Sequence, residues 1–64
     1  MWIIIRGVRY NFNQIRFYYA VGSTVFLLSP EQDKDEKINI NLKTPLEANE
    51  LVEQIDTRTG AQTL

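Results

Sequence analysis

The sequence predicts a small α+β domain: an antiparallel β-meander of three to four strands, with one C-terminal α-helix packed on one face. Three observations support this class. A glycine turn joins two apolar segments, a strictly alternating segment follows, and the last apolar stretch has helical spacing. Strands followed by a helix are typical of α+β folds. A chain of 64 residues is expected to form a single domain over residues 1–59, with a frayed tail at residues 60–64.

The first apolar segment, residues 2–6, is short and rich in β-branched side chains. This pattern predicts a strand that is at least partly covered on both sides. Residues 7–14 leave two alternatives open, an extra strand or a turn. Within them, residues 11–14 favour a reversal of the chain with Phe12 turned inward, because asparagine side chains bond their own backbone in turns.

The central segment, residues 15–29, predicts a β-hairpin closed by Gly22 and Ser23. Only glycine takes at no cost the positive φ that the first position of a type II′ turn requires. The turn sets the register, and alternation divides the hairpin into two faces. The face predicted to form the core is nearly all apolar: Ile15, Phe17, Tyr19, Val21, Thr24, Phe26 and Leu28. The face predicted to stay open is mixed: Arg16, Tyr18, Ala20, Val25, Leu27 and Ser29.

Pro30 is predicted to end the second hairpin strand, because proline has no N–H for the ladder. Residues 31–37 contain no apolar side chain, so they are expected to form a solvated loop. Residues 37–43 alternate strictly between polar and apolar side chains, the pattern of a strand with one buried and one wet face. Its apolar members are expected to join the core beneath the helix: Ile38, Ile40 and Leu42.

The last segment begins with three signals for a helix start. Thr44 is a good N-cap, Pro45 suits the first helical position, and Glu47 is placed to bond back to the Thr44 N–H in a capping box. Gly60 is a natural C-cap. Between these ends, apolar residues recur at i, i+3, i+4 and i+7, which predicts one buried stripe. The stripe consists of Ala48, Leu51, Val52 and Ile55.

The composition argues against an enzyme. The chain has no cysteine and no histidine, so disulfides are excluded, a zinc site is not expected, and a catalytic triad has no base. The acidic residues 31–36 lack the glycine of an EF-hand loop. We therefore expect no catalytic residue, no cofactor and no metal. The apolar start is too short for a signal peptide or a membrane span, so a cytoplasmic protein without membrane contact is expected.

Charge is distributed unevenly along the chain. Residues 1–30 hold three arginines and no acid, whereas residues 31–64 hold eight acids against four bases. Such asymmetry is typical of a surface for an anionic partner, and it also arises by chance in short chains.

The open face of the hairpin is the expected functional surface, because one helix covers only one side of a sheet. An exposed apolar strip favours protein contact, and an unpaired edge strand offers a second route to a homodimer. We therefore expect a small non-catalytic protein-interaction or self-association module, with a protein partner or homo-oligomer contact. The expected contact residues are Arg16, Tyr18, Ala20, Val25 and Leu27. The alternative is single-stranded RNA or other nucleic acid bound on the same face, since aromatics beside arginines stack on unpaired bases.

Overall fold

The computed structural model of the chain describes residues 1–31 and 34–64. Across these residues the chain forms five strands followed by one helix, and every strand pair is antiparallel. The elements are β1 (Trp2–Ile5), β2 (Val8–Asn11), β3 (Phe17–Val21), β4 (Thr24–Glu31), β5 (Lys34–Asn41) and α1 (Pro45–Thr59). The predicted α+β class with a C-terminal helix is confirmed, with one strand more than the upper number predicted.

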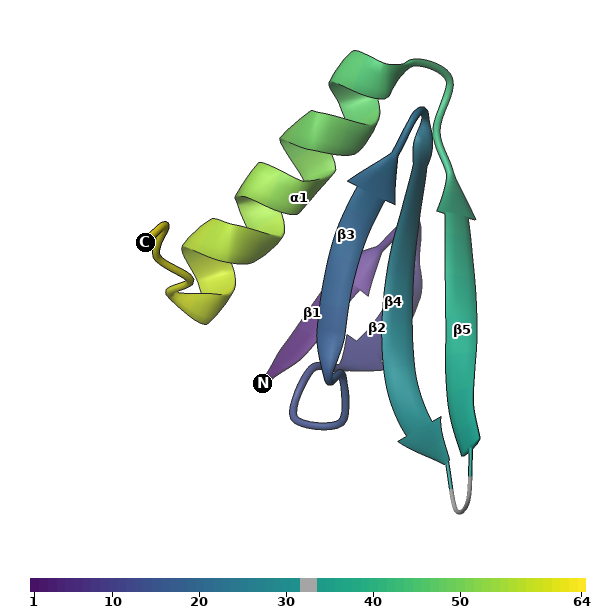
Figure 1. The fold of residues 1–64 in the computed structure, drawn as a ribbon, viewed down its shortest axis with the longest axis vertical. Coiled ribbons are helices and arrows are strands. Elements are labelled where there is room, and N and C mark those ends of the chain that lie inside the picture. The colour runs from purple at the N-terminus through teal and green to yellow at the C-terminus, as the bar shows by residue number, and fades with distance from the viewer. Residues whose placement is uncertain (32–33) are drawn as a thin grey trace.

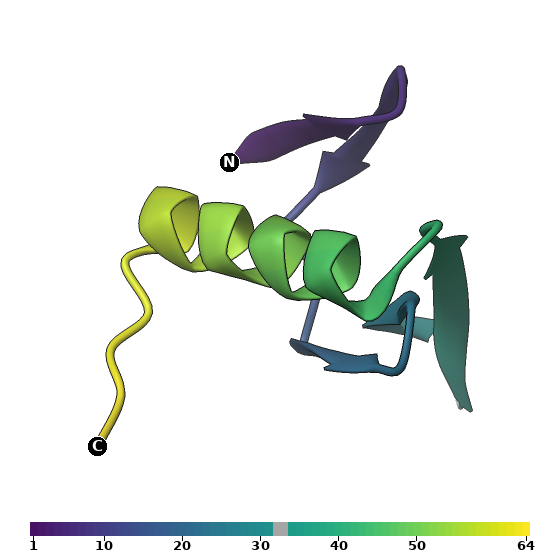
Figure 2. The ribbon, with the colours of Figure 1, turned by 90° about the horizontal axis from the view of Figure 1, so that it is seen from above.

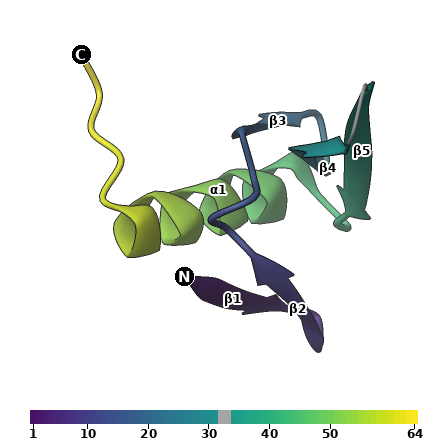
Figure 3. The same ribbon diagram turned by 90° about the horizontal axis from the view of Figure 1, so that it is seen from below.

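The strands form two sheets that share one helix (Figure 1). β1 pairs with β2, and the second sheet has the order β3-β4-β5, so each strand pairs with a neighbour in the sequence. Seen from above and from below, α1 runs between the β1–β2 hairpin and the three-stranded sheet (Figure 2, Figure 3). Both sheets and the helix contribute to the buried core: Ile5, Val25, Leu27, Ile40, Ala48 and Ile55.

A two-residue turn, Arg6 and Gly7, joins β1 to β2. The φ angles of these residues are 52° and 79°, and two successive positive φ values are those of a type I′ turn, which suits the twist of a hairpin. The turn decides between the alternatives for residues 7–14, because residues 8–11 form an extra strand and the chain then reverses. Phe12 lies in this reversal and packs against the core, as predicted.

The β1 strand is covered on one side only, so the prediction of cover on both sides is wrong. Ile5 is 5% exposed, whereas Trp2 and Ile4 are 67% and 59% exposed. Successive side chains of a strand point to opposite faces, and the core lies against only one face of the β1–β2 hairpin. The other face therefore presents large apolar side chains to solvent.

The second hairpin has the predicted turn and the predicted register. Gly22 has a φ of 59°, while Ser23 has no positive φ, and this combination is the one that a type II′ turn requires. Pairing then runs outward from Val21 and Thr24 as expected.

The face of this hairpin that lies under α1 is the opposite of the one predicted. Val25 and Leu27 are fully buried, whereas Phe17 and Val21 are 46% and 61% exposed. The prediction of an open strip is therefore wrong. Apart from the exposed Arg16, its members pack in the core or against it: Tyr18, Ala20, Val25 and Leu27.

The pairing of β4 with β5 explains the reversal. Residues paired directly across two strands share a face, and here Ile40 pairs with Val25 while Ile38 pairs with Leu27. The alternation of β5 correctly predicts that its two isoleucines face the core, and their partners in β4 follow them. A shift of one residue in this register would bring the opposite face of the sheet inward.

The β4 strand continues through Pro30, so the prediction that Pro30 ends it is wrong. The last pair between β3 and β4 involves Leu28, and beyond it the described part of the chain places a strand on one side of β4 only. A proline is tolerated there, because an N–H on the open side has no strand to donate to. The predicted loop over residues 31–37 is also wrong where β4 and β5 occupy it, and residues 32–33 lie outside the described residues.

The helix begins and ends at the predicted residues. The Thr44 Oγ1 accepts a hydrogen bond of 3.2 Å from the Glu47 N–H. The Glu47 carboxylate accepts from the Lys43 N–H at 3.4 Å, one residue before the predicted partner. Gly60 has a φ of 76° and donates to the Asp56 carbonyl at 2.9 Å. The predicted apolar stripe faces the core: Ala48, Leu51, Val52 and Ile55.

Candidate functional site

Four of the five residues of the predicted contact surface lie in the core beneath the helix or pack against it, and Arg16 does not. Tyr18 and Ala20 are half-buried against the core, and Arg16 stays exposed just before β3, where its N–H donates to the Leu28 carbonyl at 2.7 Å. The large exposed apolar side chains of the strands lie elsewhere: Trp2, Ile4, Val8, Phe17 and Val21.

Tyr18 connects β3 to the end of α1. Its hydroxyl donates a hydrogen bond of 2.6 Å to Oδ1 of Asp56 and lies 3.2 Å from Oγ1 of Thr59. Its ring packs edge-on against Phe12, with 6.1 Å between the ring centroids. Burial raises the pKa of Tyr18 above its ordinary value of 10.0, and both the hydrogen bond to Asp56 and the negative charge of that residue act in the same direction, whereas the hydrogen bond with Thr59 opposes them. The neutral hydroxyl is therefore the form that the folded protein favours.

A Tyr18→Phe variant is expected to lose about 1 kcal/mol of unfolding free energy at neutral pH, because it lacks a hydrogen bond to a carboxylate. The pKa of Tyr18 is higher in the folded chain than in the unfolded chain. The stabilisation is therefore complete below about pH 10, and it is lost as the pH rises through the folded-state pKa. Urea unfolding from neutral to alkaline pH should show a steeper alkaline loss in the original protein than in the variant. Parallel curves would contradict this role.

The outer sheet face is the side of the three-stranded sheet that turns away from the core. Paired residues line up across β3, β4 and β5 in three rows. The rows are Phe17-Leu28-Lys37, Tyr19-Phe26-Asn39 and Val21-Thr24-Asn41. The β3 column is entirely apolar and the β5 column entirely polar, and none of these side chains is acidic.

Three aromatic rings cluster on the outer sheet face. The Tyr19 ring centroid lies 6.2 Å from that of Phe17 and 5.2 Å from that of Phe26, and both pairs are stacked. The Lys37 Nζ lies 4.4 Å from the Phe26 ring centroid, a cation–π distance. Because the rings cover one another, Tyr19 and Phe26 are half-buried while Phe17 remains exposed. The result is a preformed aromatic surface with a cation at its edge.

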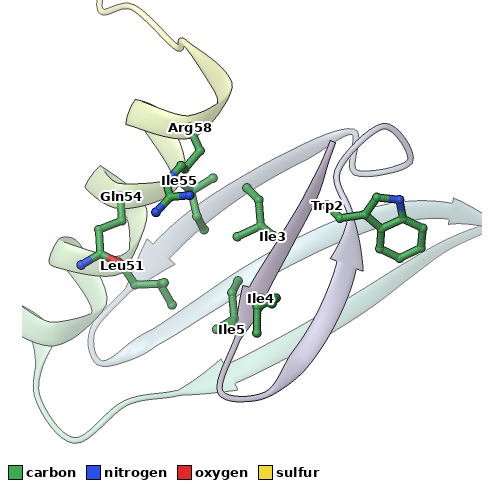
Figure 4. Close-up of a pocket in the computed structure, with 8 residues that line it drawn as sticks. All are labelled: Trp2, Ile3, Ile4, Ile5, Leu51, Gln54, Ile55 and Arg58. Atoms are coloured by element: carbon green, nitrogen blue, oxygen red, sulfur yellow. The ribbon is translucent and has the colours of Figure 1, made fainter.

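A second feature is a groove that lies between β1 and α1, called here the β1–α1 groove (Figure 4). Its volume is about 300 Å³. Its walls are Trp2, Ile3, Ile4 and Ile5 of the strand and Leu51, Gln54, Ile55 and Arg58 of the helix. The helix residues have the spacing of one helical face. Figure 4 shows Ile3 near Ile55 and Arg58, with Trp2 turned away from the helix.

The edge of β1 that faces away from β2 carries unpaired main-chain groups. The Phe12 N–H donates to the Met1 carbonyl at 2.8 Å. Since hydrogen-bonded pairs alternate along an antiparallel ladder, this bond fixes the odd-numbered residues of β1 as those bonded to β2. The N–H and C=O of Trp2 and Ile4 therefore point away from β2, and no strand of the described residues pairs with them.

The chain holds neither histidine nor cysteine, and residues 1–31 and 34–64 contain no group of three or more carboxylates that could hold a metal ion. In the same residues, no helix has the length and apolar composition needed to cross a bilayer.

No family model, curated protein or solved structure matches this chain. The α+β arrangement alone assigns no function, because one small fold can carry many different sites. The outer sheet face and the β1–α1 groove are therefore the features from which function is inferred.

Sequence reasoning misses both surfaces. The rings of the outer sheet face resemble core residues because they are large and apolar. The feature that argues against their burial is the pairing of β4 with β5, which places Val25 and Leu27 on the same face as Ile40 and Ile38. The groove has a signal of its own. Gln54 and Arg58 lie three and seven residues after Leu51, on one helical face, and residues 2–5 are apolar on both sides of the strand.

Proposed function

We propose that this protein is a small non-catalytic protein-interaction module. Its outer sheet face packs against another protein surface, in the simplest case the same face of a second copy. The observation that supports this is the aromatic cluster of Phe17, Tyr19 and Phe26, together with the lack of any acidic residue in the three rows that cross β3, β4 and β5. Aromatic residues are enriched at the buried centre of protein interfaces, and acidic residues are depleted there. A chain without cysteine also suits the cytoplasm, where we propose that the module acts.

Sedimentation velocity from micromolar to millimolar concentration tests this function. The protein is expected to associate as its concentration rises, and a Phe17→Ser variant is expected to stay monomeric. Phe17 is 46% exposed, so its replacement leaves the fold intact. The matched control is Trp2→Ser, which changes an exposed aromatic residue outside the outer sheet face and should associate like the original protein. A monomer at every concentration, unchanged by either substitution, would contradict self-association.

A second candidate function is binding of single-stranded nucleic acid on the same face. The observation that favours it is Lys37 over the Phe26 ring, since stacked aromatics beside cations hold unpaired bases and phosphates. The three rows contain one lysine and the chain has a net charge of −1, which together make a weak electrostatic footprint. Titration with oligouridine at low salt separates the candidates: salt-sensitive NMR shifts at Tyr19 and Phe26 would favour nucleic acid over protein.

A further inference from the structure

We infer that the β1–α1 groove binds an extended peptide segment, which adds to the free edge of β1 as a third strand and places an acidic side chain beside Arg58. This site is separate from the outer sheet face and goes beyond the interaction proposed above. Three observations carry the inference: the unpaired edge of β1, the apolar walls of the groove, and the charge at one of its ends.

The unpaired edge supplies the main-chain recognition. Trp2 and Ile4 each present an N–H and a C=O away from β2, and an edge of this kind is a template for another strand. Addition of a peptide strand to a sheet edge beside a helix is an established mode of peptide recognition. Since all four β1 residues line the groove although their side chains alternate in direction, the edge itself forms one of its walls.

The side chains on both faces of β1 match an added strand. Residues of the peptide that point inward would contact Ile3, Leu51 and Ile55, which line the groove. Residues that point outward would lie beside Trp2 and Ile4, which are now largely exposed. A volume of about 300 Å³ is at the lower end of ligand sites, so it suits two or three small apolar side chains. An added strand would thus cover both apolar faces of β1.

Arg58 defines the polar end of the groove and the direction of the peptide. It lies at the Ile3 end, opposite Leu51 (Figure 4), and among the described residues it makes no hydrogen bond or ion pair with another side chain. Antiparallel pairing is slightly more stable per residue than parallel pairing. A peptide antiparallel to β1 brings its C-terminal part to Arg58, where an acidic side chain gains a charge-assisted hydrogen bond.

The probe is the capped peptide acetyl-Val-Thr-Val-Thr-Glu-amide, whose only carboxylate is the glutamate side chain. In the inferred arrangement the valines and the glutamate face the groove, and the two threonine N–H groups bond to β1. Titration into the full chain, followed by NMR, should shift the amides of Trp2 and Ile4 and slow their hydrogen exchange. Methylation of the two threonine nitrogens should abolish binding, whereas methylation of the central valine nitrogen, which points away from β1, should not.

The charge at Arg58 is tested with a second pair of molecules. An Arg58→Gln variant should bind the glutamate peptide about fivefold more weakly, and it should bind the matching glutamine peptide as the original protein does. Equal binding of the two methylated peptides, or no shift at Trp2 and Ile4 at millimolar peptide, would overturn the inference. Shifts of these amides that follow protein concentration without any peptide would overturn it too, because a second copy would then occupy the groove.

The two proposals can fail independently. A Phe17→Ser variant should bind the peptide with unchanged affinity, since Phe17 lies on the outer sheet face and not in the groove. Loss of self-association in this variant with peptide binding retained supports both sites. Peptide binding in a protein that never self-associates overturns only the proposed function.

Discussion

Replacing Leu27 with alanine is expected to lower the free energy of unfolding by about 3 kcal/mol. Leu27 is fully buried on the central strand β4, with Tyr18 and Ile38 as its paired neighbours in β3 and β5. Strands on both sides hold the backbone in place, so the surroundings cannot collapse into the cavity. A domain of this size has a stability margin of a few kcal/mol. Urea unfolding followed by circular dichroism should therefore find much of the Leu27→Ala variant unfolded without denaturant.

The matched control is the same substitution at an exposed leucine. Leu46 is 66% exposed in the first turn of α1, so Leu46→Ala should change stability by less than about 0.5 kcal/mol. A small loss of stability in Leu27→Ala together with a large loss in Phe17→Ala would show that the face of the hairpin with Phe17 is the buried one. That outcome would also remove the outer sheet face as a surface.

Replacing Ile5 with alanine should lower the free energy of unfolding by about 2 to 3 kcal/mol, because the neighbours of a buried isoleucine fill the resulting cavity only in part. Ile5 is 5% exposed, and it belongs to the same core cluster as Ile55 and Leu27. It is thus the main buried link between the β1–β2 hairpin and the rest of the protein. Its loss should loosen the hairpin first, so hydrogen exchange should speed up in β1 and β2 before β4.

Ile4→Ala is the control for this experiment, because Ile4 is the next residue of the same strand and is 59% exposed. It should change stability by no more than about 0.5 kcal/mol and leave hydrogen exchange in β1 and β2 nearly as it was. Equal effects of the two substitutions would contradict the one-sided burial of β1.

Local signals in the sequence predict most elements of this fold. Gly22 sets the turn and register of the second hairpin, and Thr44 and Gly60 set the ends of the helix, because each of these residues acts on the backbone beside it. The side of the sheet that is buried is a different kind of property. It depends on how β4 pairs with β5, where one residue of register exchanges the two faces.

Four of the predicted site residues are buried or half-buried because of this pairing: Tyr18, Ala20, Val25 and Leu27. The opposite face of the hairpin carries aromatic rings, which are larger than the side chains of Val25 and Leu27. Judged by the size of its side chains alone, the aromatic face is therefore the one expected to be buried. In the structure, Tyr19 and Phe26 cover each other instead, and Tyr18 reaches the core with its hydroxyl bonded to Asp56. The groove depends on the approach of β1 to α1, a contact between the two ends of the chain that no local pattern encodes.

The order of the strands has a consequence for how the protein reaches this fold. Every strand pairs with one that is next to it in the chain, through connections of a few residues, so each pairing closes a short loop at a small entropic cost. A long closure is the return of α1 to β3, where the hydrogen-bonded residues Tyr18 and Asp56 are 38 positions apart in the sequence. Low sequence separation accompanies fast folding. The β1–β2 hairpin and the β3-β4-β5 sheet can therefore form early and independently of each other, and docking of the helix is the step that joins them into one cooperative unit.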